Sequence, residues 1–280
     1  MSIEQKRTSR RDFLKKTGIV GATMALGVMA EPLLGASGPA FAATGGPFEP
    51  IPQILGLALT AEQLATTFYY LGINSTATLP QSTNSGNIPY LQAALDAENF
   101  HAQLLADAGG VSVAGPNPMF YFPQGTFAND NNFLAVLNAL ETAFIEAYLA
   151  AIYQFGSQGR SDLAQVAGEI MGVEAEHRVL GRQILTDFTS LKVPNNLLLE
   201  EADGTSVAVV AQALIPFLSA NNFNGASDGP YALPSQSQIA AAVGSNVGIN
   251  PNTGSSSSSP GPMMPGMPGM PPTPPAPPMS

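Results

Sequence analysis

The 280-residue chain contains no cysteine and no tryptophan, and it has only two histidines. Without cysteine there can be no disulfide, no thiolate metal site and no cysteine nucleophile. Charged residues make up only 11% of the chain, so most of its polar surface must come from Asn, Gln, Ser and Thr. These absences direct attention to the carboxylates and to the two imidazoles.

The abundant residue types indicate that one part of the chain folds compactly and another part does not. Its length allows one or two domains, and a hydrophobic share of 45% is enough to fill a core. The 25 prolines and 28 glycines indicate that some of the chain is not compactly folded.

Residues 1–42 have the features of an export leader. Residues 9–15 (SRRDFLK) match a twin-arginine signal, a small-residue apolar stretch follows at 17–30, and Ala-Phe-Ala at 40–42 offers a cleavage site. The alternative is a membrane anchor, but glycines dilute the apolar stretch and Glu31-Pro32 interrupts it before about 20 residues. We therefore predict export through the twin-arginine pathway to the periplasm or beyond, without stable membrane insertion after cleavage.

Removing this leader would change the charge balance. The remainder would carry four basic and 17 acidic residues, a formal net charge of −13. A surface of that sign argues against nucleic acid or an anionic membrane as a partner.

Both histidines stand three residues after a glutamate, as Glu98/His101 and Glu174/His177. Three residues of α-helix turn through about 300°, so each pair projects from a single helical face. One such pair is weak evidence, whereas two on predicted inward faces are hard to obtain by chance.

Apolar periodicity predicts four long helices, over 51–71, over 89–108, from about Asn129 to 155 and over 161–188. Glu62 and Glu141 lie on the apolar faces of the first and third. By helical phase Glu146 points elsewhere. On the fourth helix, Glu169 and Glu176 fall outside the apolar face, where they are solvated or paired with Arg178 and Arg182.

Four inward carboxylates and two imidazoles on four helices make a ligand set for two metal ions. Burying those carboxylates without cations would cost several kcal/mol each or force protonation. The predicted ligands are Glu62, Glu98, His101, Glu141, Glu174 and His177.

A tyrosine follows each single glutamate by seven residues, Tyr69 after Glu62 and Tyr148 after Glu141. Both would stand on the metal-facing side of their helices. A radical or outer-sphere role is one interpretation, but hydrogen-bonded core tyrosines are more common, and we favour that role.

Loop lengths indicate the topology. About six residues join the third and fourth helices, which makes them antiparallel neighbours. Residues 109–129, with three prolines and two glycines in 111–129, are predicted to be a long crossover without regular structure, sufficient to traverse a bundle of roughly 30 Å. Two hairpins joined by a crossover give an all-α four-helix bundle.

The C-terminal part adds a predicted fifth helix over 205–220 and a disordered Ser-, Pro-, Gly- and Met-rich tail over 221–280. The tail methionines could bind Cu(I), but a flexible spacer or partner-contacting segment is the commoner role for such tracts. These methionines are Met263, Met264, Met267, Met270 and Met279.

Together, the Glu, Glu-x-x-His, Glu, Glu-x-x-His order and the crossover resemble the ferritin-like superfamily. The segments around Glu62 to Tyr69 and Glu141 to Tyr148 are similar to exported bacterial ferritin-like proteins, including desiccation-related ones. The resemblance covers about 50–220 and implies that the six residues are metal ligands. Ala65 departs from it, since many such relatives carry an acidic residue there.

Oxygen donors with two imidazoles suit iron or manganese better than copper or zinc. We therefore predict two iron ions, or alternatively two manganese ions, and an oxidoreductase acting on peroxide, O2 or ferrous iron. The alternatives are a non-enzymatic stress or desiccation-related envelope protein with structural metals, and a dimanganese catalase-like activity. A homo-oligomer is compatible with the pattern.

Overall fold

The computed structural model describes residues 48–75, 87–188, 200, 202, 204–220, 222–223 and 226–244. All of them belong to one compact unit, which ends by Gly248. The predicted leader and the serine- and methionine-rich part of the predicted tail lie outside the described residues.

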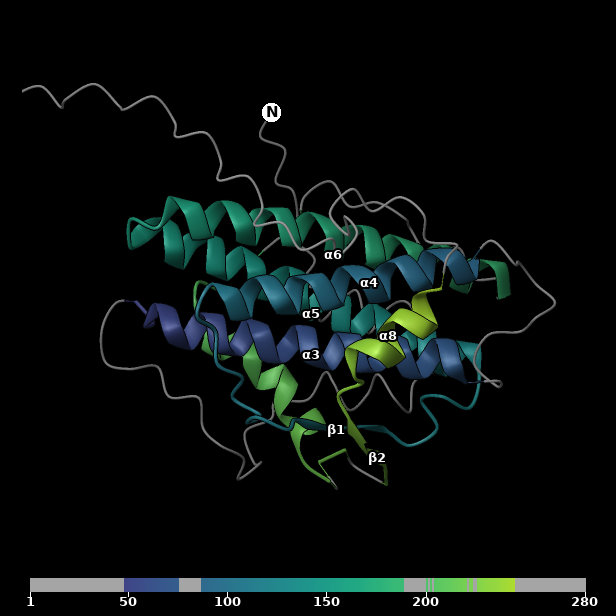
Figure 1. Ribbon diagram of the computed structural model, residues 1–280. Helices are drawn as coiled ribbons and strands as arrows, with labels where there is room; N and C mark the ends of the chain where they lie inside the picture. Colours follow the sequence, from purple (N-terminus) through teal and green to yellow (C-terminus); the bar gives the residue numbers. More distant parts are fainter. Residues whose placement is uncertain are drawn as a thin grey trace, which may run out of the picture. The chain divides into compact units, whose positions relative to one another are not determined.

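Four long helices form the bundle predicted from the sequence (Figure 1). They are α3 (Ile51–Asn74), α4 (Asn87–Asp107), α5 (Asp130–Ser157) and α6 (Ser161–Phe188). Only residues 158–160 join α5 to α6, and these two helices pack along each other. The Asn129 side chain accepts a hydrogen bond from the backbone N–H of Asn132 (3.0 Å), so the predicted cap does begin α5.

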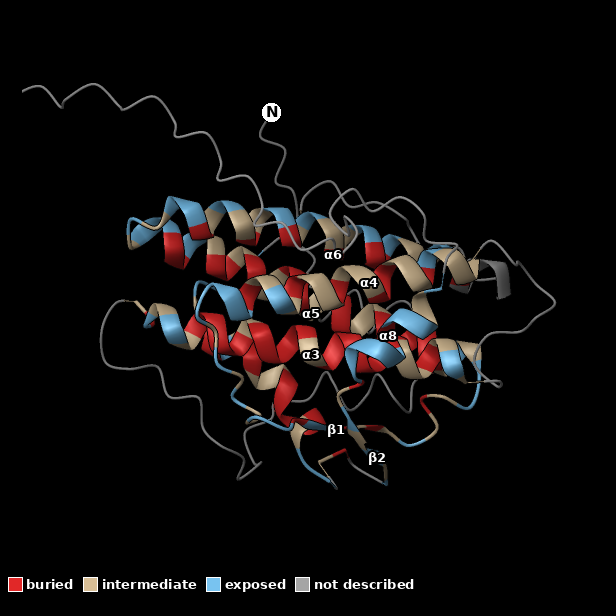
Figure 2. Ribbon diagram, viewed as in Figure 1, coloured by how far each residue is buried: buried red, intermediate tan, exposed pale blue. Residues whose placement is uncertain are grey.

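The apolar faces of the helices meet inside the bundle, where Figure 2 shows the buried residues. On α5 the apolar residues that share a face with Glu141 are buried, namely Phe133, Leu137, Leu140, Phe144, Tyr148, Ala151 and Phe155. Among the described helices only α5 is long and apolar enough to cross a membrane, but 61% of that apolar window is buried within the protein. This burial is what a core helix requires.

Close approach of α5 to its neighbours depends on two glycines. A Cβ atom at Gly72 would lie 2.3 Å from the ring of Phe133, and one at Gly181 would lie 2.4 Å from Cδ2 of Leu137. Real Cβ atoms do not come so near to other heavy atoms, so larger residues would push α5 away from α3 or α6.

The crossover is not without regular structure, and on this point the sequence prediction was wrong. Strand β1 (Met119–Pro123) lies within it and pairs antiparallel with β2 (Ser227–Ala232). Phe120 and Phe122 are fully buried, and the ring centroid of Phe122 lies 5.7 Å from that of Phe68 on α3. Aromatic packing therefore ties the crossover to the bundle.

The predicted fifth helix is shorter and less regular than expected. It consists of a single α-turn, α7 (Val207–Val210), followed by the 3-10 helix η1 (Ala211–Leu218). Pro216 within η1 has no backbone N–H to donate, which is consistent with the absence of a longer α-helix here.

The prediction of a disordered tail over 221–280 was also wrong for its first part, since β2 and α8 (Gln236–Val243) lie there. Helix α8 begins with a capping box formed by Ser235 and Gln238. The side chain of Gln92 on α4 donates a hydrogen bond to the carbonyl of Ala242 (2.8 Å), so α8 is fastened to the bundle.

A buried carboxylate anchors the start of the described chain. Glu49 accepts hydrogen bonds from the hydroxyl of Ser206 (2.5 Å) and from the N–H groups of Val207 and Ala208 (both 2.9 Å). The backbone N–H of Glu49 in turn donates to Gln154 of α5 (3.0 Å). These bonds hold α7 and η1 against the bundle near α3 and α5.

Candidate metal centre

The four bundle helices deliver six ionisable side chains to one place in the core. Each helix contributes an inward glutamate, and α4 and α6 each add a histidine one turn later. The glutamates are at most 2% exposed, and His101 and His177 are 5% and 7% exposed. We call these residues the six-residue cluster: Glu62, Glu98, His101, Glu141, Glu174 and His177.

The cluster divides into two overlapping groups of four. In each group, one donor atom per residue lies within 4.8 Å of the donor atoms of the other three. Glu98 and Glu174 belong to both groups. The first group is completed by Glu62 and His101, and the second by Glu141 and His177.

The imidazoles turn Nδ1 towards the shared carboxylates. Nδ1 of His177 lies 2.8 Å from an oxygen of Glu98 and 3.5 Å from one of Glu174. Nδ1 of His101 lies 3.7 Å and 3.5 Å from the other oxygens of the same two residues. The two halves of the site are therefore arranged alike.

Eight buried oxygen and nitrogen atoms of the cluster form no hydrogen bond of acceptable geometry, although the imidazole nitrogens lie 2.8–3.9 Å from carboxylate oxygens. Buried polar atoms normally have one, because each unsatisfied atom costs about 1–3 kcal/mol. They are Oε2 of Glu62, both carboxylate oxygens of Glu98, Nδ1 of His101, Oε2 of Glu141, both carboxylate oxygens of Glu174, and Nδ1 of His177.

Glu62 and Glu141 each belong to only one of the two groups. In each of them, carboxylate oxygen Oε1 accepts a hydrogen bond from a tyrosine of the other helical hairpin. The hydroxyl of Tyr69 on α3 donates to Oε1 of Glu141 on α5 (2.6 Å), and that of Tyr148 on α5 donates to Oε1 of Glu62 on α3. The prediction that both tyrosines are hydrogen-bonded core residues is thus confirmed. The sequence did not show that the pairs cross between α3 and α5.

Burial and mutual repulsion set the protonation of the cluster without metal. Burial first, and then the nearby Glu174 carboxylate, raise the pKa values of Glu98 and Glu141 well above the usual range. Burial also disfavours ionisation of Glu174, but its contacts with His101 and His177 outweigh that cost and lower its pKa. Without a bound cation, Glu98 and Glu141 are therefore held towards the protonated, neutral form.

Residues 52–187 match the model of a known family, the ferritin-like domain. The chain contains a ferritin-like domain. The match spans all four bundle helices and all six cluster residues, and it confirms the superfamily suggested by the sequence. Searches of curated proteins and of solved structures found no match to this chain.

The residues of the ferritin-like domain fit a pair of metal ions. Each group of four offers one imidazole nitrogen and carboxylate oxygens, all gathered within the spread expected of donors around a single ion. The unpartnered oxygens and nitrogens are the atoms that metal coordination would satisfy, and two cations would offset the buried negative charge.

The remaining acidic residues singled out on α5 and α6 stay outside both groups. Glu146 is not part of the cluster, and Glu169 and Glu176 are exposed, as helical phase predicts. The exposure of Glu169 and Glu176 agrees with the solvated alternative predicted for them. Arg178 is only 3% exposed and forms an ion pair with Glu200, beyond the end of α6.

Proposed function

We propose that the ferritin-like domain binds two iron or manganese ions and is an oxidoreductase acting on peroxide, dioxygen or ferrous iron. The observation that supports this most directly is the set of eight buried, unpartnered donor atoms in two overlapping groups. A bundle core would not tolerate four such carboxylates for stability alone.

In this proposal Glu98 and Glu174 would help to hold both ions, because each belongs to both groups and neither of its oxygens accepts a hydrogen bond. Glu62 and His101 would complete the ligands of one ion, and Glu141 and His177 those of the other. When bound, a pair of such ions exchanges two electrons with dioxygen or peroxide.

The two tyrosines orient the unshared glutamates. By binding one oxygen of the carboxylate, Tyr69 and Tyr148 leave the other oxygen free to face the cluster. Burial is the main cause that raises the pKa values of both phenols, so each keeps the proton that it donates.

The decisive experiment compares wild type with His177→Ala. The purified protein should contain about two iron or manganese ions per chain, and the reduced protein should be oxidised by dioxygen or peroxide. Because His177→Ala removes the only nitrogen donor of one group, it should lower the oxidation rate by more than roughly tenfold. Stopped-flow absorbance and peroxide consumption measure this.

Glu176→Ala is the matched control, since Glu176 is exposed on the same helix and should leave the rate unchanged. A wild-type protein that holds both ions but reacts with neither oxidant would refute the oxidoreductase. That result would favour the second candidate, a stress or envelope protein whose metals stabilise the bundle. The observation that supports this second candidate is the buried charge of the cluster.

We further propose that the protein is exported by the twin-arginine pathway, on the basis of residues 9–15 and 40–42. This route carries folded proteins, which would allow metal loading before transport. Replacing Arg10 and Arg11 by lysine should leave the longer precursor in the cytoplasm, as detected by immunoblotting of cell fractions. Unchanged processing of that variant would contradict the proposal.

A further inference from the structure

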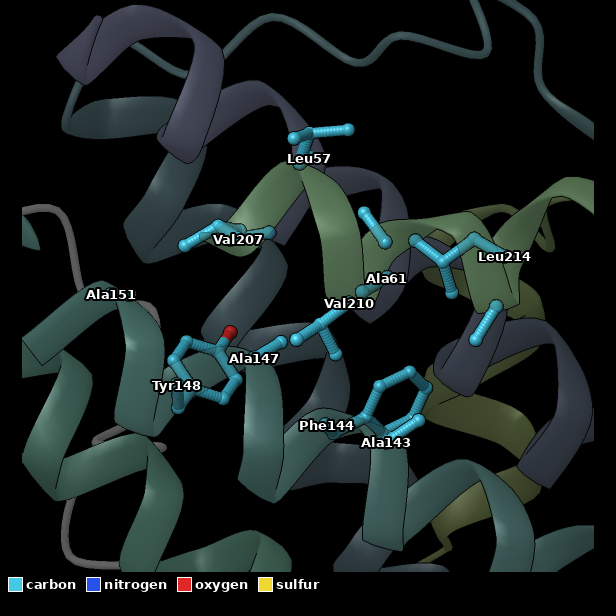
Figure 3. A pocket seen from close by; sticks show the side chains of 13 residues that line it. Leu57, Ala61, Ala143, Phe144, Ala147, Tyr148, Ala151, Val207, Val210 and Leu214 are labelled. Carbon is cyan, nitrogen blue, oxygen red and sulfur yellow. The ribbon is translucent and has the colours of Figure 1, made fainter. Parts of the chain in front are cut away.

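Two apolar cavities lie on either side of Tyr148. The first is lined by α3, α5 and the α7–η1 segment, and Figure 3 shows side chains from these elements around it. The second lies between α3, α4, α5 and α6. Ala58, Tyr148 and Ala151 line both cavities, so the two spaces are neighbours.

The lining of both cavities is almost entirely apolar. Alanine recurs in the first one, on α3, α5 and η1, at positions where larger residues would fill the space. The one hydroxyl in the lining belongs to Tyr148, and it is already bonded to Glu62. A polar guest would therefore find no free hydrogen-bonding group that this lining supplies.

The cavities also have room for a small molecule. Their volumes are about 20 Å³ and about 40 Å³, compared with the roughly 10–15 Å³ that one water molecule requires. Empty apolar space costs stability, at about 24 cal/mol per Å³.

Their position points to one half of the metal centre. Ala58 lies one helical turn before Glu62 on α3, so the two side chains are neighbours on one face. The other half of the centre does not border these two cavities. Tyr69 borders neither cavity, and its ring lies 5.9 Å from that of Phe68 and 5.7 Å from that of His177.

We propose that these cavities bind dioxygen and deliver it to the Glu62 and His101 side of the centre. This inference rests on the proposed function and selects among its substrates. Dioxygen is apolar and small, whereas peroxide would have to give up its hydrogen bonds with water to enter such a space. Dry apolar cavities in proteins bind xenon for the same reason.

Xenon tests the cavities independently of any metal. Crystals of the purified protein under xenon pressure should show anomalous scattering beside Tyr148, and Ala58→Leu, which fills space common to both cavities, should weaken that signal. No xenon beside Tyr148 would overturn the inference. If xenon binds but the protein holds no metal, the proposed function fails while the apolar site remains.

Kinetics tests the substrate. In Ala58→Leu the oxidation of the reduced protein by dioxygen should slow by roughly tenfold, while oxidation by peroxide should stay within about twofold of wild type. Ala147→Leu, at the first cavity only, should have a smaller effect. Ala139→Leu is the matched control, because Ala139 is also a partly buried alanine of α5 but lines neither cavity.

Xenon should also slow the dioxygen reaction of the unmodified protein, which keeps the test valid if a variant fails to fold. Equal slowing of both oxidants in Ala58→Leu would indicate damage to the metal centre instead of a blocked route. A wild-type dioxygen rate in a folded Ala58→Leu protein would overturn the inference and leave the proposed function intact.

Discussion

Glu98→Ala should purify with almost no bound metal, whereas Glu62→Ala should retain about one ion per chain. Glu98 belongs to both groups of donors, and both of its oxygens are unpartnered. Removing it takes an oxygen ligand from each ion at once. Glu62 belongs to one group only, so its loss should weaken the ion beside His101 and spare the ion beside His177.

Elemental analysis of the purified variants measures this difference directly. Glu146→Ala on α5 and Glu176→Ala on α6 serve as controls, because both residues lie outside the cluster and should keep the wild-type metal content. If Glu98→Ala retained both ions, the assignment of this residue as a shared ligand would be wrong.

Removing the metal should lower the melting temperature of the protein substantially. Ions that bind only the folded state stabilise it by about 2.7 kcal/mol at a concentration 100 times the Kd. For a domain of this size that corresponds to roughly 5–10 °C. The physical cause is the cluster, where buried carboxylates without cations repel one another or must take up protons.

Calorimetry with and without a chelator measures the shift, and the melting temperature should rise again as free metal is added. The chelator should have no effect on Glu98→Ala, which is expected to hold no metal. Equal melting temperatures for the loaded and chelated wild type would show that the buried charge is neutralised in another way.

The candidate site could be predicted from the sequence because a straight helix determines which side chains share a face. Glu141 and Glu146 are both glutamates on the same helix, and only the direction in which each projects from the helix axis distinguishes them. The apolar residues around Glu141, such as Leu137 and Phe144, identified the inward face, and both are buried.

Helical phase could not reveal how residues from different helices meet. It placed Tyr69 and Tyr148 on inward faces, but each proved to bind the glutamate of the other helix. Nor did it show that Arg178, next to a predicted ligand, is buried and paired with Glu200. Such contacts depend on the rotation and depth of packed helices.

The prediction that the crossover has no regular structure was wrong for a related reason. A five-residue strand rich in aromatic residues is too short to be distinguished from a loop by sequence pattern alone. Its partner, β2, lies about 100 residues later in the chain and gives no local signal. The alternation of buried Phe120 and Phe122 was present in the sequence, but its meaning depended on that distant partner and on Phe68.

The sequence by itself determined the four helices, their inward faces and the six residues of the cluster, because these follow from local periodicity. The tertiary structure decided what covers the bundle. With β1, η1 and α8 also packed around it, α3 is buried on more than the single face predicted for it. Within that covering, the α7–η1 segment, anchored through Glu49, lines one side of the first cavity beside Tyr148. A cavity of this kind requires segments distant in sequence to meet, which no local pattern specifies.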